Sequence, residues 1–346
     1  MRILFVFKEI PIENLFVYSL RDALISNGIE AKCSVEDFWH NYETYDIIHF
    51  HWLINHIQIS TTKDADKFIN QFNAIQTRCK VVATCHDLKP HYSKNPYLET
   101  VMNYIYDHCD AMIHLGKYSF EYFTETRSNI KAKHYIIPHH IYNNYYNFSL
   151  YKSFARKQLK IPLDANVLLC FGRFRSDIER NFVLNAWEKA DIQNKYLLVP
   201  RFYHVRRNFI LGYKQVIKAI NYRLHGVHFL NNLIPHNKLE TYFCAADILM
   251  IQRAIILNSG NLSLGFHAKK VVIGPNTGNV REILEKTGNP VFDPNNISSV
   301  TKAIQEGFHL KDTELPQKNY EYAMKNWNVF EIARKHIEVY QDILNN

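Results

Sequence analysis

The chain has 346 residues, of which 47% are hydrophobic and 21% charged, a composition that excludes an intrinsically disordered protein. At roughly 150 residues per domain, this length predicts about two domains. Only 11 residues are glycine, and neither a G-x-G-x-x-G fingerprint nor a P-loop motif occurs. The net charge of +8 suits contact with phosphates or an anionic membrane face.

The cysteines and the longest apolar runs indicate the compartment. Six cysteines are scattered without a C-x-x-C pair, which favours buried thiols in a reducing environment. No run of about 18 apolar residues occurs, so no membrane-spanning helix is predicted. We therefore expect a cytoplasmic protein, or one that contacts a membrane from its cytoplasmic face.

Short apolar segments alternate with longer segments of helical period along the whole chain. Strands that alternate with helices form parallel sheets, and two such series predict two doubly wound domains. The pattern breaks near 141–162, where asparagines and tyrosines cluster. The predicted strands are 3–7, 46–50, 81–84, 111–115 and 135–138 in the first half, and 167–171, 196–199, 227–229, 248–251, 271–273 and 291–292 in the second.

Three predicted strands of the first half end in histidines, namely His51, His86 followed by Asp87, and His139. We interpret them as the polar lining of a cleft between domains, because loops at strand ends carry function in this architecture. A zinc site formed by His51, His86 and either His91 or His139 is an alternative. No H-E-x-x-H motif or cysteine pair supports it, so no metal is predicted. Purely structural histidines are the third interpretation.

A possible metal–diphosphate motif occurs at Asp64-Ala65-Asp66, which has D-x-D spacing. It follows three hydroxyl residues, Ser60, Thr61 and Thr62, and not an apolar strand. We therefore interpret the two acids as residues of a helix start, where they are favourable to the helix macrodipole.

In the second half, three of the predicted strands run into glycine-containing loops that open helices. Gly172 and Arg173 follow one strand, and Arg180 precedes a helix predicted over 182–190; the loops at 257–261 and 274–282 repeat the pattern. Backbone N–H groups at helix starts bind anions, and arginine binds phosphate oxygens in a bidentate manner. Each of the three could be an ordinary surface loop. Because all three follow strands of one sheet, we expect them to converge on one crevice.

The most basic stretch is 201–223, in which six Lys and Arg residues alternate with apolar ones and no acid occurs. A solvated helix is one interpretation, and a surface for anionic lipid or a lipid-linked phosphate is the other. No known nucleic-acid-binding module is present, so no nucleic-acid partner is predicted.

The last predicted helix begins at Asn328, which has capping-box spacing to Glu331. Residues three and four positions apart lie on the same helix face, which predicts a single buried stripe. That stripe is predicted to consist of Trp327, Phe330, Arg334, Ile337, Tyr340 and Leu344.

Together these segments resemble a glycosyltransferase of the GT-B type, close to the large retaining family 4, over nearly the whole chain. The segments that carry the resemblance are DIIHFHW (46–52), TCHDLKPH (84–91), IIPH (136–139), FGRF (171–174) with Arg180-Asn181, LETYFCAADILM (239–250), LNSG (257–260) through 274–275 with Glu282, and the helix 327–344.

The resemblance implies two Rossmann-like, doubly wound parallel-sheet domains that face a cleft, with the C-terminal helix crossing back to the first domain. Residues 1–148 and 327–346 would bind the acceptor, and 149–326 would bind a nucleotide sugar. The implied activity is transfer of a sugar from a nucleotide-diphosphate sugar to a glycan or lipid-linked acceptor in surface polysaccharide synthesis, a hexosyltransferase reaction.

The resemblance also implies roles for individual residues. Retention of anomeric configuration is expected, with neither a metal nor a cofactor besides the donor substrate. The catalytic residues would be His86, Arg173 and Arg180; the donor-binding residues Gly172, Asn258, Ser259, Gly260, Asn279 and Glu282; and the acceptor-binding residues His51, Asp87 and His139.

The sequence departs from the family in the donor domain. Family 4 usually carries two glutamates in an E-x7-E motif, and alignment places Ile256 and Leu264 at those two positions. The missing pair keeps open a catalytically degenerate scaffold or binding subunit. A sugar-nucleotide epimerase, an enzyme class that shares this double-domain fold, is a further alternative.

Overall fold

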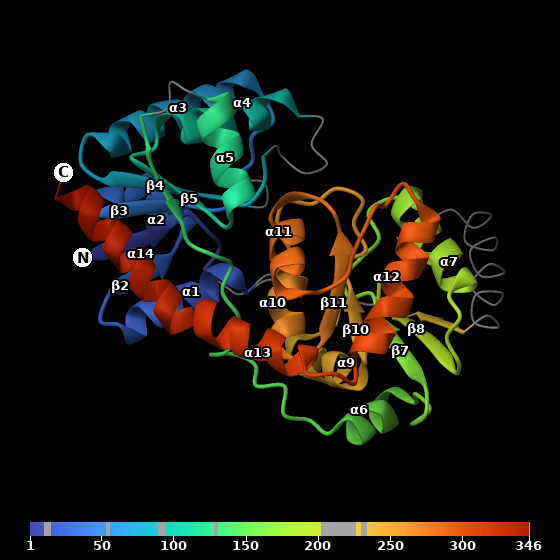
Figure 1. Cartoon of the computed structure of the whole chain (residues 1–346). Coiled ribbons are helices and arrows are strands. Elements are labelled where there is room, and N and C mark those ends of the chain that lie inside the picture. The colour runs from blue at the N-terminus through green and yellow to red at the C-terminus, as the bar shows by residue number, and fades with distance from the viewer. Residues whose placement is uncertain are drawn as a thin grey trace, which may run out of the picture. The chain divides into compact units, whose positions relative to one another are not determined.

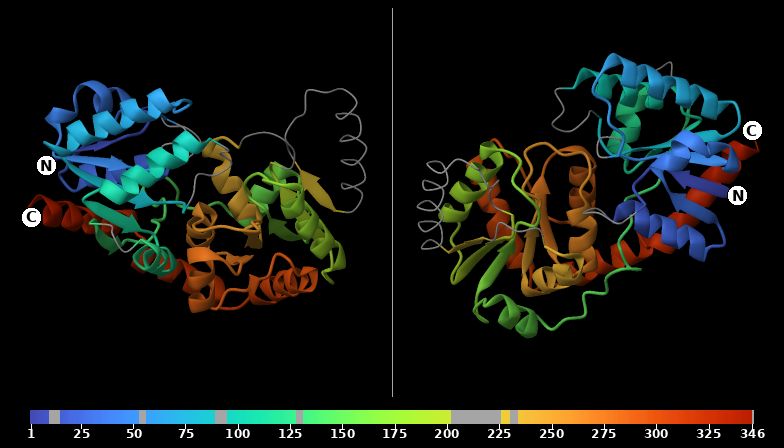
Figure 2. Two further views of the ribbon diagram at one scale, coloured as in Figure 1. Left: turned by 90° about the horizontal axis from the view of Figure 1, so that it is seen from above. Right: turned by 180° about the vertical axis from the view of Figure 1, so that it is seen from behind.

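The computed structural model describes residues 1–9, 15–52, 56–88, 95–127, 131–201, 226–229 and 234–345. The chain divides into two compact units (Figure 1). One contains Met1–Tyr145 and Asn326–Asn346, and the other contains Tyr146–Lys325. Each unit is a parallel sheet flanked by helices (Figure 2), which confirms the predicted fold class.

The first unit is built on a parallel sheet with the strand order β2-β1-β3-β4-β5-β6. Its strands are β1 (Arg2–Phe5), β2 (Glu30–Cys33), β3 (Ile47–Phe50), β4 (Lys80–Cys85), β5 (Ala111–His114) and β6 (Lys133–Ile136). Its helices are α1 (Phe16–Ser26), α2 (Val35–His40), η1 (Tyr42–Thr44), α3 (Thr62–Gln76), α4 (Pro96–His108), α5 (Lys117–Thr126) and the C-terminal α14 (Val329–Leu344).

The second unit has the strand order β12-β11-β10-β7-β8-β9, so the direction of winding reverses between β7 and β10. Its strands are β7 (Asn166–Leu169), β8 (Lys195–Val199), β9 (Val227–Phe229), β10 (Ile248–Met250), β11 (Val271–Pro275) and β12 (Val291–Phe292). Its helices are α6 (Lys152–Leu159), α7 (Asp177–Lys189), η3 (His236–Lys238), α9 (Leu239–Ala245), α10 (Gly260–His267), α11 (Gly278–Thr287), α12 (Ile297–Leu310) and α13 (Leu315–Asn326).

Short apolar runs were the correct signal for the strands. All eleven predicted strands are present, with ends within two residues of those predicted. The strand β2 was missed because it lies at the sheet edge and only Cys33 of its four residues is fully buried. The buried strands carry continuous apolar runs, as expected for parallel strands covered on both faces.

The helix starts are set by side-chain caps. Ser176 accepts a hydrogen bond from the Glu179 backbone N–H, so α7 begins at Asp177 and not at the predicted residue 182. At the start of α3, Thr61 and Asp64 form a reciprocal capping box. The D-x-D acids therefore lie at a helix start, as predicted, and the backbone N–H of Ser60 lowers the pKa of Asp64.

The C-terminal helix α14 belongs to the first unit, where it packs against α1 (Figure 1). The predicted buried stripe is wrong in part. Trp327 and Tyr340 are buried, but the rest of the buried face is Val329, Ile332, Ala333, His336, Val339 and Ile343. The prediction followed the largest apolar side chains, whereas the helix buries β-branched and small ones. Asn328 caps the helix as predicted, and Glu331 pairs with Arg334.

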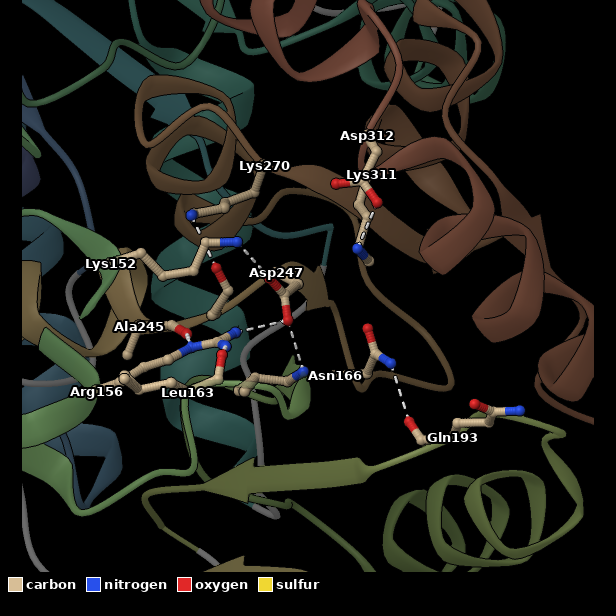
Figure 3. Close-up of polar contacts among 12 residues, drawn as sticks. Lys152, Arg156, Leu163, Asn166, Gln193, Ala245, Asp247, Lys270, Lys311 and Asp312 are labelled. Carbon is tan, nitrogen blue, oxygen red and sulfur yellow. Dashed lines mark hydrogen bonds and ion pairs between the residues drawn. The ribbon is translucent and has the colours of Figure 1, made fainter.

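A buried carboxylate joins α6 to the sheet of the second unit (Figure 3). One oxygen of Asp247 accepts hydrogen bonds from Arg156 Nη2 at 2.7 Å and from the Val167 backbone N–H at 2.8 Å; the other accepts from Lys152 Nζ at 2.8 Å. The side chains of Asp247 and Arg156 are each 4% exposed. Because Asp247 precedes β10 and Val167 belongs to β7, this pair fixes the amino ends of two adjacent strands.

We predict that Asp247→Asn destabilises the protein by at least about 3 kcal/mol, because it leaves the Arg156 guanidinium buried without a counter-charge. Asp312 provides the matched control, since it also pairs with a lysine, Lys311, but is 77% exposed (Figure 3). Asp312→Asn should change the free energy of unfolding by less than about 0.5 kcal/mol. Urea unfolding measures both; equal losses would contradict the assignment.

Candidate functional site

The reversal of strand order between β7 and β10 marks the place where open α/β sheets bind ligands. Side chains that follow β10 hold the loop that follows β7. Gln252 Nε2 donates to the carbonyl oxygens of Phe171 and Gly172, both at 3.2 Å, and Asn261 Nδ2 donates to Phe171 O at 2.6 Å. Gly172 has a φ of 98°, a conformation that suits glycine. The two loops thus form one bonded unit.

An ion pair between Arg253 and Glu179 stabilises the same place. Arg253 Nη1 lies 3.1 Å from Glu179 Oε2 and donates to the Arg173 carbonyl oxygen at 2.9 Å. The same carboxylate accepts from the Arg175 backbone N–H at 2.6 Å. Burial and the positive charge of Arg175 lower the pKa of Arg253 to about 10, so it stays protonated at neutral pH. Neither Arg253 nor Glu179 is among the site residues predicted from the sequence.

The two predicted catalytic arginines both come from the connection between β7 and α7. Arg173 is exposed, and its backbone pairs with Arg201 in an isolated parallel bridge. Arg180 lies in the first turn of α7 and not before the helix, and its guanidinium forms an ion pair with Asp177. An anion at this helix start would therefore compete with Asp177 for Arg180.

In the sheet, β10 lies beside β7 and β11 lies beside β10; the loops that follow these two strands lead into α10 and α11. Asn279 Nδ2 donates to Asn258 Oδ1 at 2.8 Å, and the Asn279 backbone N–H donates to Leu257 O at 2.9 Å. Gly278 has a φ of 58°, and a Cβ there would lie 2.4 Å from Ile256 O, so only glycine fits. The structure thus brings Asn258 and Asn279 together. Three other predicted donor residues lie at helix starts or on helices: Ser259 directly precedes α10, Gly260 is its first residue, and Glu282 lies on α11.

The two positions of the E-x7-E motif are apolar and inward-facing. Ile256 and Leu264 are both buried, so neither offers a hydrogen-bond acceptor to a ligand.

In the first unit, the histidines predicted from strand ends lie together. His51 Nδ1 is 2.9 Å from His86 Nε2, and the Trp52 ring stacks on His86 with centroids 3.5 Å apart. The Phe16 ring contacts both His86 and His139, at centroid distances of 5.0 and 4.7 Å. Phe16 opens α1, which follows β1, and the strand order of this sheet reverses between β1 and β3.

Four further members of this cluster were not predicted as site residues. His49 Nδ1 lies 2.7 Å from the Tyr340 hydroxyl, and its ring centroid is 4.3 Å from that of His51. His336 and His140 are also buried beside them. The two-residue repeat of a strand was the available signal for His49, since residues i and i+2 share a face.

Burial controls the protonation of the cluster. It lowers the pKa of His49, His51, His86 and His140 well below the ordinary value, and neighbouring histidines lower it further. The pKa values of His139 and His336 fall to about 4 for the same reason. These rings are therefore neutral at pH 7, each with one donor and one acceptor nitrogen. Within the described ranges, no group of three or more His, Cys, Asp or Glu is arranged to hold a metal ion.

A small cavity adjoins His51 and His86. Its volume of about 30 Å³ fits one or two water molecules and is too small for a sugar ring. Asp87 lines it, and the Tyr106 hydroxyl donates to the Asp87 carbonyl oxygen at 3.2 Å. His51, His86 and Asp87 are thus buried around this cavity.

Two features predicted from the sequence, a histidine and a basic segment, have no structural description. His91 and the basic segment 201–223, apart from Arg201, lie outside the described residues. Among the helices that are described, none is both long enough and apolar enough to cross a membrane.

Comparison with known proteins shows similarity in structure alone. No protein-family model and no curated protein matches the sequence. Sucrose-phosphate synthase from Thermosynechococcus elongatus matches over 100% of both chains, at 16% identity and a TM-score of 0.69. HepE from Anabaena, solved in complex with UDP-glucose, is similar at 15% identity and a TM-score of 0.67, and the match covers 99% of this chain and 100% of the HepE chain. A glycosyltransferase from Rickettsia africae matches at 16% identity over 100% of this chain and 99% of its own, with a TM-score of 0.66. The chain therefore has the GT-B fold of these proteins.

We predict that acid destabilises the protein through its neutral histidines. Below about pH 6.5 the unfolded chain binds protons that the folded cluster excludes. The free energy of unfolding therefore decreases as the pH is lowered, until the pH reaches the folded pKa values, about 4 for His139 and His336. The nitrogens of His140 form no hydrogen bond with any described residue. His140→Phe removes one of these histidines. The free energy of unfolding that it loses between pH 7 and pH 5 should therefore be about 2 kcal/mol smaller than the loss in the wild-type protein.

Urea unfolding at the two pH values measures this gain. The exposed His309, in His309→Phe, is the control and should leave the difference between pH 7 and pH 5 unchanged. An unchanged difference in His140→Phe would show that His140 takes up a proton in the folded state.

Proposed function

We propose that the protein is a hexosyltransferase that moves a sugar from a nucleotide-diphosphate sugar to a glycan or lipid-linked acceptor. The observation that carries this proposal is the bonded pair of loops at the β7–β10 reversal, where Arg253 pairs with the buried carboxylate of Glu179 and the charges of Arg175 and Arg173 lie close enough to lower the pKa of Arg253. The local excess of positive charge suits a diphosphate. The fold supports it, since the similar HepE was solved with UDP-glucose.

On the donor side, Arg173 and Arg180 would neutralise the departing diphosphate, aided by backbone N–H groups at Ser259 and Gly260. One such contact is worth about 10²–10³ in rate when it strengthens in the transition state. The arginines and the start of α10 then supply the charge that a metal would otherwise provide, which makes the reaction metal-independent in this proposal. Gly172, Asn258, Asn279 and Glu282 would position the rest of the donor.

On the acceptor side, His86 would contact the donor sugar or the attacking hydroxyl. Its neutral imidazole can donate or accept a hydrogen bond without carrying a charge. His51, Asp87 and His139 would orient the acceptor. Retention of configuration, a role in surface polysaccharide synthesis and a membrane contact through 201–223 complete the proposal, and they rest on the resemblance and the sequence.

A binding subunit without catalytic activity is the second candidate. The buried Ile256 and Leu264 favour it, because a family glutamate at the second position would hold the ribose. Absence of nucleotide binding would favour this candidate, and if a nucleotide binds, turnover separates the enzyme from a binding subunit that has kept the donor site.

The donor site predicts nucleotide-dependent stabilisation. A nucleotide diphosphate at about 100 times its dissociation constant should stabilise the protein by about 2.7 kcal/mol. A thermal-shift screen with UDP, GDP, CMP and dTDP should give a shift with one base, and Arg173→Ala should abolish it. Arg334→Ala removes an exposed arginine of the first unit and should retain it. No shift with any of these nucleotides would contradict the donor assignment.

The enzyme and the binding subunit differ in turnover. With the nucleotide sugar of the base that binds, the wild-type protein should release the nucleoside diphosphate, either by transfer to an added glycan or by slow hydrolysis. We predict that His86→Ala keeps the nucleotide-induced thermal shift but loses this release, because His86 belongs to the first unit. Binding without release by the wild-type protein would favour the binding subunit.

A further inference from the structure

Three large apolar side chains are exposed within a short stretch of the second unit. Tyr151 is 84% exposed, Phe154 50% and Leu163 55%. Tyr151 directly precedes helix α6, Phe154 lies on it, and Leu163 lies in the segment that follows it. Isolated exposed apolar residues are ordinary, whereas a cluster of them marks a surface that contacts another molecule.

The helix presents two different faces. Ala155 and Arg156 are buried against α9, and Leu159 lies on their side of the helix. Phe154 and Lys157, three residues apart, lie on the opposite, exposed face of the helix, and the exposed Tyr151 is the N-cap residue just before it. We define the α6 surface as Tyr151, Phe154, Lys157, Lys160 and Leu163.

Internal bonds hold the α6 surface in place. The guanidinium of Arg156 donates to three acceptors: the carboxylate of Asp247, Ala245 O at 3.1 Å and Leu163 O at 2.6 Å (Figure 3). The last of these bonds fixes the turn that carries Leu163. The aromatic side chains are therefore displayed on an anchored helix.

Within the stretch 150–163, which carries these side chains, all charged residues are basic. Residues 150–163 contain no Asp or Glu. Lys157 and Lys160 are exposed, and neither pairs with a carboxylate in the part of the chain that the structure describes. The next acid along the chain, Asp164, accepts a hydrogen bond from Asn194. Aromatic and apolar side chains at headgroup depth, flanked by lysines, are the combination that binds an anionic bilayer.

We propose that the α6 surface docks on the anionic face of a lipid bilayer. A second protein is a poorer occupant, since a stable protein interface needs roughly 800 Å² from each partner and this helix has only eight residues. The proposal does not rest on sugar transfer. The helix lies at the amino ends of β7 and β10, at the sheet edge opposite the arginine loops, so docking leaves those loops accessible.

Co-sedimentation of the full chain with vesicles tests the proposal. The wild-type protein should bind phosphatidylcholine vesicles only when phosphatidylglycerol is added, and high salt should weaken the binding. Lys157→Gln with Lys160→Gln should lose about fivefold in affinity for each lysine. The control Lys302→Gln with Lys325→Gln removes the same charge from exposed positions on α12 and α13, and should lose less than about twofold.

The apolar contribution needs its own variants. Tyr151→Ser with Phe154→Ser should lose about tenfold or more, while Ile25→Ser, at a position also 50% exposed but in the first unit, should not. Retention of the nucleotide-induced thermal shift shows that these variants are folded. If the wild-type protein shows no such shift, an unchanged unfolding temperature shows instead that the variants are folded. The vesicle test therefore stands even if the donor site is wrong.

A fluorescent label locates the contact. All six native cysteines are buried, so the thiol of Phe154→Cys can be labelled selectively with an environment-sensitive dye. Its emission should shift to the blue with phosphatidylglycerol vesicles, whereas the same label on Ile25→Cys should not respond. Absence of wild-type binding, equal losses in the control variants, or a dye response only on self-association of the protein would overturn the proposal.

Discussion

The constraint on which this structure depends is the parallel arrangement of its strands. Every strand of a sheet ends at the same edge, so every loop that follows a strand opens there. The winding reverses between β7 and β10, the place where open α/β sheets bind ligands. There, Gln252, Arg253 and Asn261 bind the backbone of the loop that follows β7. The reversal between β1 and β3 lies beside the buried histidines in the same way.

Each edge of the second sheet holds one buried carboxylate among basic groups. At the amino edge, Asp247 pairs with Arg156 and Lys152 and accepts a hydrogen bond from the Val167 backbone N–H, so it joins two strands. At the carboxyl edge, Glu179 pairs with Arg253 and accepts a hydrogen bond from the Arg175 backbone N–H. The second arrangement lies where the strand order reverses and beside the exposed Arg173, which is why we place anion binding there.

The sequence predicts local features better than long-range ones. The apolar strands, the Asp64 cap and the grouping of His51, His86 and His139 follow from patterns within a few residues or from the sheet rule. The contacts that complete each site join distant positions: His49 with Tyr340, 291 residues apart, and Glu179 with Arg253, 74 apart. Such pairs depend on how helices pack on the sheets, and hydrophobic periodicity does not encode that packing. The face of α14 was misjudged for the same reason.

The nucleotide-sugar site is tested most directly by hydrogen–deuterium exchange of the full chain with and without UDP-glucose. We expect slower exchange in 170–176 and 251–261, the loops at the β7–β10 reversal, and unchanged exchange in 152–163 at the opposite edge. No protection, or protection confined to segments away from the reversal, would contradict a nucleotide-sugar site there.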